Sequence, residues 1–180
     1  MSRVRTLTLV ALAVSALTMT GCSSSSSSPT TTAAASTTPT TSGPPTTIPA
    51  GDLSPAGVAG TAPTVTVPAG KPPTRLETAD LITGTGPAAK AGDSVTVQYV
   101  LATYSSRKTI QSSWSSQPFT FTLGAGQVIP GWDQGVVGMQ VGGRRELIIP
   151  PSLGYKDQSP GAGIAANDTL VFIVDLVSIN

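Results

Sequence analysis

The side chains that perform most enzyme chemistry are scarce in this chain. Its 180 residues contain no histidine and a single cysteine, Cys22. Without an imidazole there is no Ser-His-Asp triad, no Cys-His dyad and no imidazole metal site. The carboxylates of Asp133 and Glu146 could form an acid/base pair, but one falls early in an expected helix and the other points outward from an expected strand. Surface roles are therefore favoured for both, and neither a metal nor a cofactor is expected.

Two further motifs could hold an anion, and neither is convincing as a binding site. Gly124-Ala125-Gly126 is glycine-rich, but no Gly-Lys-Ser/Thr follows it, so a hairpin turn is favoured over a phosphate loop. Arg144-Arg145 is interpreted as a solvated pair. Ten basic and nine acidic residues give a formal charge of +1. This balance provides no concentrated positive field, so nucleic acid is not expected as a partner.

The remaining candidates are aromatic and aliphatic side chains that gather near Gly-Pro turns in the C-terminal part of the chain. All eight aromatic residues follow residue 98, and the first 73 residues contain none. Only residues 74–180 can therefore build a dense core, and 107 residues are enough for one domain without disulfides or metals. On composition alone, these side chains are the core of that domain.

The elements that would position these side chains are mostly strands, which alternating apolar and polar residues predict. Strands are expected at residues 76–83, 95–101, 119–123, 145–149 and 169–179. One helix is expected at residues 131–139, because Pro130 favours its start and Gly138 favours its end. The predicted architecture is an α+β domain in which an antiparallel sheet curls over one short helix.

The N-terminus has the features of a secretory signal. Arg3 and Arg5 precede an apolar run at residues 7–20, which is too short for the roughly 20 residues that span a bilayer. The run ends in Leu17-Thr18-Met19-Thr20-Gly21-Cys22, which resembles the bacterial lipobox. Residues 1–21 are therefore predicted to be a lipoprotein signal peptide, with Cys22 lipidated. The alternative is an ordinary signal peptide followed by an unmodified cysteine.

The segment between this signal and the domain has the composition of a linker. From residue 23 to residue 73, 44 of 51 residues are Ser, Thr, Pro, Ala or Gly. Such a composition cannot bury enough surface to offset chain entropy. Residues 22–73 are therefore predicted to be a disordered tether that starts at the lipidated Cys22. The protein is expected to lie outside the cytoplasm, anchored to the cell membrane by an N-terminal lipid.

The order and spacing of motifs from about Leu76 to the end of the chain are specific. These motifs are Phe119-Thr120-Phe121-Thr122-Leu123-Gly124, Gln127 to Val136, Met139 to Arg145, Ile149-Pro150-Pro151, Leu153-Gly154-Tyr155 and Asp168 to Phe172. Together they resemble the FKBP-type peptidyl-prolyl cis-trans isomerases. The resemblance implies an antiparallel half-barrel sheet wrapped around the short helix, with a prolyl pocket between them.

The resemblance also implies roles for particular residues. Catalytic roles fall to Tyr99, Trp132, Tyr155 and Phe172, and substrate-binding roles to Ile110, Gln111, Phe119, Gln127, Val128, Ile129 and Ile164. Trp132 would form the pocket floor, and the backbone amide of Ile129 and the hydroxyl of Tyr155 would each hold a substrate carbonyl. Ile164 would lie in a loop that overhangs the pocket.

The resemblance implies isomerisation of X-Pro bonds by non-covalent stabilisation of the twisted amide. The expected role of this activity is to assist the folding of exported proteins. The expected partners are proline-containing polypeptides, macrolide inhibitors and the lipid membrane through the acylated Cys22. The alternative is a module that binds prolyl segments, as a chaperone would, with weak or no turnover.

Three residues depart from the family pattern. Members usually carry Phe-Asp-Ser-Ser where this chain has Ile110-Gln111-Ser112-Ser113, and Tyr-Gly where it has Tyr155-Lys156. Ile110 lacks an aromatic face, Gln111 lacks a carboxylate, and Lys156 lacks the freedom of glycine at positive φ. These departures predict changes in catalytic efficiency and macrolide affinity but not in the fold.

Overall fold

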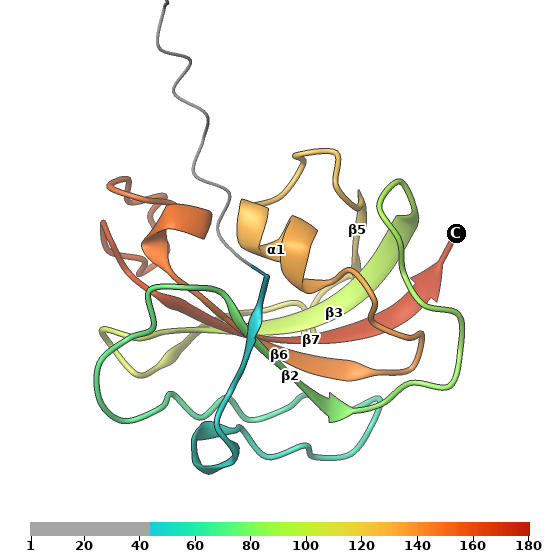
Figure 1. Ribbon diagram of the computed structural model, residues 1–180, viewed down its shortest axis with the longest axis horizontal. Helices are drawn as coiled ribbons and strands as arrows, with labels where there is room; N and C mark the ends of the chain where they lie inside the picture. The colour runs from blue at the N-terminus through green and yellow to red at the C-terminus, as the bar shows by residue number, and fades with distance from the viewer. Residues whose placement is uncertain (1–43) are drawn as a thin grey trace, which may run out of the picture. The chain divides into compact units, whose positions relative to one another are not determined.

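The computed structural model describes residues 44–180, which form one sheet with a short helix on one face (Figure 1). The elements in chain order are β1 (Thr46–Thr47), a 3-10 turn (Ala50–Asp52), β2 (Glu77–Ile82), β3 (Ser94–Thr103), β4 (Thr109–Ser112), β5 (Phe119–Thr122), α1 (Pro130–Gly135), β6 (Arg144–Ile149), a 3-10 turn (Pro151–Leu153) and β7 (Leu170–Ile179). The predicted α+β fold is confirmed. The short strands β1 and β4 are the two that the sequence did not predict.

The sheet has the order β1-β2-β6-β7-β3-β4, and β5 also pairs with β3. All pairings are antiparallel except β1 with β2. The ladder of β3 with β5 ends at Val97, whereas its ladder with β4 begins at Val100. Between these points Ser113 completes the backbone pairing, because its Oγ accepts from Tyr99 N at 2.8 Å and its N–H donates to Tyr99 O at 3.0 Å. The backbone of Tyr99 is therefore fixed at the point where the partner of β3 changes from β5 to β4.

Helix α1 packs directly on the sheet at two glycines, where no helix side chain separates its backbone from the side chains of β6. A Cβ at Gly131 would lie 2.4 Å from Ile149 Cγ2, and a Cβ at Gly135 would lie 2.7 Å from Leu147 Cδ2. The helix is shorter than the predicted 131–139, because after Gly135 the chain turns at Gly138, whose φ is +81°. The major core forms between α1 and this face of the sheet.

The opposite face of the sheet is covered by the segment predicted to be a tether. Ile48 is only 2% exposed and packs with Tyr104, Ile148 and Val171, while Leu53, Val65 and Val67 join the same cluster. Figure 1 shows this segment passing across the sheet on the side away from α1. The structure therefore corrects the predicted boundary at residue 74, and we call residues 44–73 the strap.

The composition of residues 44–73 predicted a disordered segment, but a few apolar side chains are enough to hold the strap against the sheet. The aliphatic side chains that interrupt its Ser/Thr/Pro/Ala/Gly sequence include those that bury against the sheet. The rest of the predicted tether, the predicted signal peptide at residues 1–21 and the predicted lipidation site at Cys22 lie outside the described residues. Within residues 44–180, no helix combines the length and hydrophobicity needed to cross a bilayer.

Two charged residues predicted to be at the surface are instead buried beneath the strap. Glu146 is 0% exposed and accepts hydrogen bonds from Ser54 N at 2.8 Å and Ser54 Oγ at 2.7 Å. Arg144 is 1% exposed and pairs with Asp175 through Nε at 2.6 Å. Both point away from α1, as the strand alternation predicts, but the strap covers that face.

The strap is bound to Arg144 through its backbone as well. Arg144 Nη1 donates to Ala56 O, and its Nη2 donates to Thr61 O, each at 2.7 Å. A guanidinium has its donors in a fixed fork, so one side chain here holds Asp175 and two strap carbonyls together.

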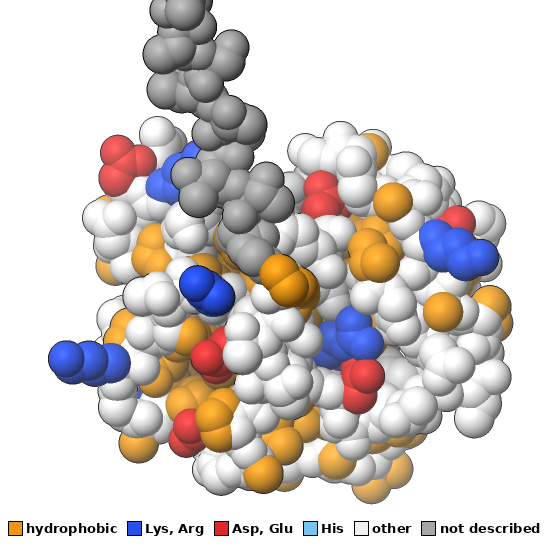
Figure 2. Space-filling model, viewed as in Figure 1, with side chains coloured by type: hydrophobic (Ala, Val, Ile, Leu, Met, Phe, Trp, Pro, Cys, Tyr) orange, Lys and Arg blue, Asp and Glu red, His pale blue; other side chains and the backbone are white. Residues whose placement is uncertain are grey.

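The charge on the face seen in Figure 2 is dispersed, since acidic and basic side chains are scattered over it.

We expect removal of the strap to destabilise the domain by on the order of 2–4 kcal/mol, because it uncovers apolar side chains of the sheet and leaves the buried Glu146 and Arg144 without their strap partners. The test compares the free energy of unfolding in urea for chains that begin at residue 44 and at residue 74. Ile48→Ala in the longer chain should reproduce much of the loss, since it removes the most buried aliphatic side chain of the strap. Equal stability of the two chains would contradict this interpretation.

We expect Glu146 to make stability depend on pH. Burial raises the pKa of its carboxyl above the ordinary 4.5, and the two bonds from Ser54 only partly oppose this. Its contribution is therefore full below pH 4.5 and is lost as the pH rises through the raised pKa. Glu146→Gln should flatten the decline in unfolding free energy from acid to neutral pH.

The control for this prediction is Glu77→Gln. Partial burial, and secondarily the charge of Asp52, also raise the pKa of Glu77, but Glu77 lies at the start of β2 and is only half-buried. Glu77→Gln should change the pH dependence of the unfolding free energy less than Glu146→Gln does. If the parent and Glu146→Gln show the same dependence of unfolding free energy on pH, the ionisation of Glu146 is not coupled to folding.

Candidate functional site

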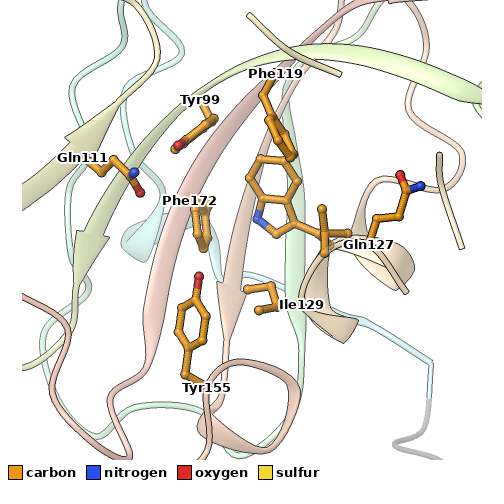
Figure 3. Close-up of a pocket in the computed structure, with 9 residues that line it drawn as sticks. Tyr99, Gln111, Phe119, Gln127, Ile129, Tyr155 and Phe172 are labelled. Atoms are coloured by element: carbon orange, nitrogen blue, oxygen red, sulfur yellow. The ribbon is translucent and has the colours of Figure 1, made fainter. Parts of the chain in front are cut away.

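A cavity of about 440 Å³ opens between α1 and the sheet (Figure 3). Its lining consists of Tyr99, Gln111, Phe119, Gln127, Val128, Ile129, Trp132, Tyr155 and Phe172. The sequence predicted a site role for every one of these residues. None of them carries a charge at neutral pH, so the cavity suits an uncharged, largely apolar ligand group.

Trp132 forms the floor of this cavity and is 4% exposed. Its indole meets Tyr99 and Phe172 edge-on, with ring centroids 5.4 Å and 5.2 Å away and interplanar angles of 81° and 83°. Phe119 makes a similar contact at 6.2 Å. Such edge-to-face pairs are favourable beyond their area burial, so the walls hold one another in place.

The strands and the helix bring these rings together from distant parts of the chain. Tyr99 of β3 and Phe172 of β7 both point toward α1, and their ring centroids are 6.0 Å apart. Trp132 follows Pro130, whose fixed φ favours the first turn of the helix. Ile129 precedes that turn as the N-cap, and its carbonyl accepts from Trp132 N at 2.9 Å. Ile129, at the rim of the cavity, and Trp132, at its floor, are therefore parts of one hydrogen-bonded turn.

Two hydroxyl groups supply polar contacts inside the aromatic walls. Burial raises the pKa of the Tyr99 hydroxyl, and the neighbouring Tyr155 raises it further. Tyr99 therefore keeps its proton at neutral pH and can donate it in a hydrogen bond. Figure 3 shows the Tyr155 hydroxyl directed toward Phe172 and Gln111 at the side of the cavity. The Gln111 side chain is solvent-exposed, so it is at the entrance.

The loop from β5 to α1 is braced by polar side chains. Gln127 points away from the aromatic rings in Figure 3, and its Oε1 accepts from Thr122 N at 2.8 Å. Asp133 accepts from Gly124 N at 2.8 Å and from Gly126 N at 3.0 Å. The glycine-rich motif is thus a turn held by a helix carboxylate. Asp133 is a structural residue and not a member of an acid/base pair.

Two predicted site residues are adjacent to the cavity but do not line it. Ile164 is 6% exposed within the core, and its carbonyl accepts from Ser159 Oγ at 2.6 Å. Ile110 packs against that core, and a Cβ at Gly163 would lie 3.4 Å from its Cγ2. Ile110 and Ile164 therefore pack at the loop of residues 159–164 beside the site, and the substrate-binding roles predicted for them stay predictions.

Lys156 takes the backbone conformation that glycine would provide. Its φ is +55°, which is uncommon for a residue with a side chain. Its N–H donates to Pro151 O at 2.9 Å, and its carbonyl accepts from Asn167 N at 2.7 Å. These two bonds hold the turn that follows Tyr155, with Lys156 in the left-handed conformation that favours glycine.

A second cavity, of about 600 Å³, lies on the strap side of the sheet. Its charged lining residues, Arg144 and Asp175, already bind each other and the strap. Trp114 also lines it, and its indole nitrogen is buried without a partner among residues 44–180. This cavity therefore offers no free charge, and the aromatic cavity is the better candidate site.

Comparison with known proteins gives a consistent result. Residues 86–177 match the sequence model of a family described as FKBP-type peptidyl-prolyl cis-trans isomerase. An FK506-binding protein of Streptomyces anulatus is 51% identical over 119 residues, which cover 65% of this chain and 96% of that protein. FK506-binding protein 2 of Dictyostelium discoideum is 48% identical over 91 residues, 51% of this chain and 68% of that protein.

Solved structures of related proteins support the same assignment. The crystal structure of AtFKBP13 has a TM-score of 0.53 and 32% identity, covering 61% of this chain and 96% of its own. The crystal structure of FkpA from Escherichia coli has a TM-score of 0.54 and 35% identity, covering 61% of this chain and 51% of its own. With its aromatic cavity beneath a sheet of this topology, the chain belongs to the family of FKBP-type peptidyl-prolyl cis-trans isomerases.

Proposed function

We propose that this protein isomerises X-Pro bonds in exported polypeptides, from a position at the outer surface of the cell membrane. The observation that carries the enzymatic part is the aromatic cavity, in which Trp132 meets both Tyr99 and Phe172 edge-on. Membership of the isomerase family supports the activity. The N-terminal sequence supports the location.

The reaction requires only that rotation about one bond become easier. Resonance gives a peptide bond a rotational barrier of about 18–20 kcal/mol, and an unaided X-Pro bond isomerises over tens to hundreds of seconds. Rotation through the twisted state reduces the charge separation of the planar amide. An apolar cavity therefore stabilises the twisted amide relative to the planar one. A reduction of the barrier by about 4 kcal/mol accelerates rotation roughly a thousandfold.

The cavity provides a surface for the proline ring and donors for the chain around it. In the proposed complex, the ring lies on the indole of Trp132 between Tyr99 and Phe172. The backbone amide of Ile129 and the hydroxyl of Tyr155 donate to carbonyls that flank the prolyl bond. These contacts hold the flanking chain while the amide rotates. No proton is transferred and no covalent bond is broken.

The alternative, a module that binds prolyl segments with little turnover, is favoured by one observation. Gln111 places a neutral amide at the cavity entrance, and hydrogen bonds to a neutral acceptor are about half as strong as those to a carboxylate. The near-complete aromatic set, which lacks only an aromatic ring at Ile110, and the hydrogen-bonded turn at Lys156 favour the enzyme. Turnover by the folded domain distinguishes the two functions.

We expect residues 44–180 to accelerate X-Pro isomerisation in a short peptide, measured by NMR exchange. Phe172→Leu should lower kcat/KM by about tenfold, equivalent to 1.4 kcal/mol, because it removes one aromatic wall. Gln111→Asp should raise the rate or the affinity for a family macrolide. Val177→Ala is the control, since Val177 is 48% exposed and does not line the aromatic cavity. A folded parent domain that binds prolyl peptides without accelerating exchange would establish the binding module instead.

The membrane location rests on the sequence that ends at Cys22. Between Cys22 and the strap there are 21 residues, which at full extension reach about 75 Å at most. If Cys22 is acylated, the domain therefore works within that distance of the lipid surface. This is much shorter than the reach of a tether extending to residue 73.

We expect Cys22→Ala to release the full chain from the membrane fraction of a bacterium that processes lipoproteins, or to leave the signal peptide uncleaved. The acyl chains provide the attachment, since each buried methylene contributes about 0.8 kcal/mol and more than one chain is needed. Intact mass and the N-terminal sequence of the purified protein report the modification. A mature N-terminus elsewhere, with no acyl mass on Cys22, would refute the anchor but not the isomerase activity.

A further inference from the structure

Three alternate residues of β6 form the surface on which helix α1 packs. Ile149 and Leu147 contact the helix backbone at Gly131 and Gly135, where a Cβ would lie 2.4 Å and 2.7 Å from their side chains. Arg145 is the third residue on the same face of the strand, because side chains two apart share a face. Its side chain is 14% exposed and reaches beyond the end of the helix.

The Arg145 guanidinium holds the C-terminal end of α1. Its Nη1 donates to Gly135 O at 2.9 Å and to Val137 O at 3.0 Å. The last carbonyls of a helix have no partner inside the helix, and a cation near them also complements the helix dipole. A helix of six residues forms few internal hydrogen bonds, so its position depends on contacts of this kind.

Asp80 on the neighbouring strand β2 fixes the guanidinium in turn. Arg145 Nε donates to Asp80 Oδ1 at 2.6 Å, and its Nη2 donates to Asp80 Oδ2 at 3.0 Å. This bidentate pair leaves Nη1 directed at the helix carbonyls. The pairing of Asp80 with Arg145 in the β2–β6 ladder places the two side chains side by side. Arg145 is therefore not the solvated residue that the sequence suggested.

The held end of the helix is one turn from the floor of the cavity. Val136, immediately after Gly135, donates its N–H to Trp132 O at 3.0 Å. Trp132 in turn donates its N–H to Ile129 O at 2.9 Å. These two backbone hydrogen bonds connect the last turn of the helix to both Trp132 and Ile129, so a shift of that turn is transmitted to them.

We propose that Arg145, fixed by Asp80, is a positioning residue for catalysis, which sets the orientation of the Trp132 indole from the opposite end of α1. The inference rests on the proposed isomerase function but concerns residues that do not touch the cavity. Catalysis by shape requires close placement, and misplacement by about 1 Å can cost two orders of magnitude in rate. A residue that only adds stability would not change the indole environment of the folded protein.

The test uses residues 44–180 with Trp114→Phe, so that Trp132 provides the only indole N–H signal in a proton–nitrogen NMR spectrum. In this background, Arg145→Met, Arg145→Lys and Asp80→Asn are compared with the parent. We expect the Trp132 signal to shift or broaden and kcat for X-Pro isomerisation to fall by about tenfold in Arg145→Met, with a smaller change in KM. Arg145→Lys should rescue only part of this loss, because a single ammonium cannot reproduce the fork.

Ser54→Ala is the matched control. It removes the hydrogen bond from Ser54 Oγ to Glu146, which is next to Arg145 in sequence but faces the strap. It should lower the unfolding free energy without moving the Trp132 signal or kcat. If Arg145→Met does not fold, Asp80→Asn decides instead, because it removes the ion pair that fixes the guanidinium against the helix end, and an unchanged Trp132 signal and kcat in that variant would overturn the positioning role.

The possible results separate this inference from the isomerase function. A folded Arg145→Met variant with the parent indole signal and parent kcat, but lower stability, would overturn the positioning role. If the parent domain shows no turnover, the isomerase function fails, and the indole signal alone decides whether Arg145 orients Trp132. An unchanged signal in both Arg145→Met and Asp80→Asn would again overturn it.

Discussion

The close contact between α1 and β6 is the constraint on which the rest of the structure depends. Because Gly131 and Gly135 carry no side chains, the helix backbone rests directly on Ile149 and Leu147. That contact brings Trp132 down among the aromatic rings of β3 and β7. A side chain at either glycine would require the helix or the side chains of Ile149 and Leu147 to move, so these two glycines set how closely the floor of the cavity approaches the sheet.

Strand β6 connects this site with the opposite side of the sheet. Its alternate residues seat the helix on one face, and those between them, Arg144 and Glu146, bind the strap on the other. A strap over the outer face shields the buried charges from water and leaves the aromatic cavity open. The family match begins at residue 86, so the strap lies outside it. The strap therefore supports the sheet from the face opposite the site, in a part of the chain that the family model does not match.

The fold could be predicted from local patterns, and the lining of the site from the resemblance to the isomerase family. Alternation predicted the long strands, and the resemblance, which rests on the order of motifs, implied site roles for all nine cavity residues. The strap could not be predicted, because its composition is that of a linker and only its spacing of aliphatic residues matches the sheet. The burial of Glu146 and Arg144 was missed for the same reason. Alternation gives the face of a strand but not what covers that face.

The absence of reactive side chains from the cavity lining follows from what the reaction needs. Rotation about an amide requires neither a nucleophile nor a base, so rate acceleration depends on how closely the aromatic walls match the twisted bond. The positions of the rings are set by residues outside the cavity. Ser113 fixes Tyr99, Asp133 binds the loop from β5 to α1, and Arg145 holds the C-terminal end of α1. In such an enzyme the determinants of rate are spread through the fold, and the supports of the rings matter as much as the rings themselves.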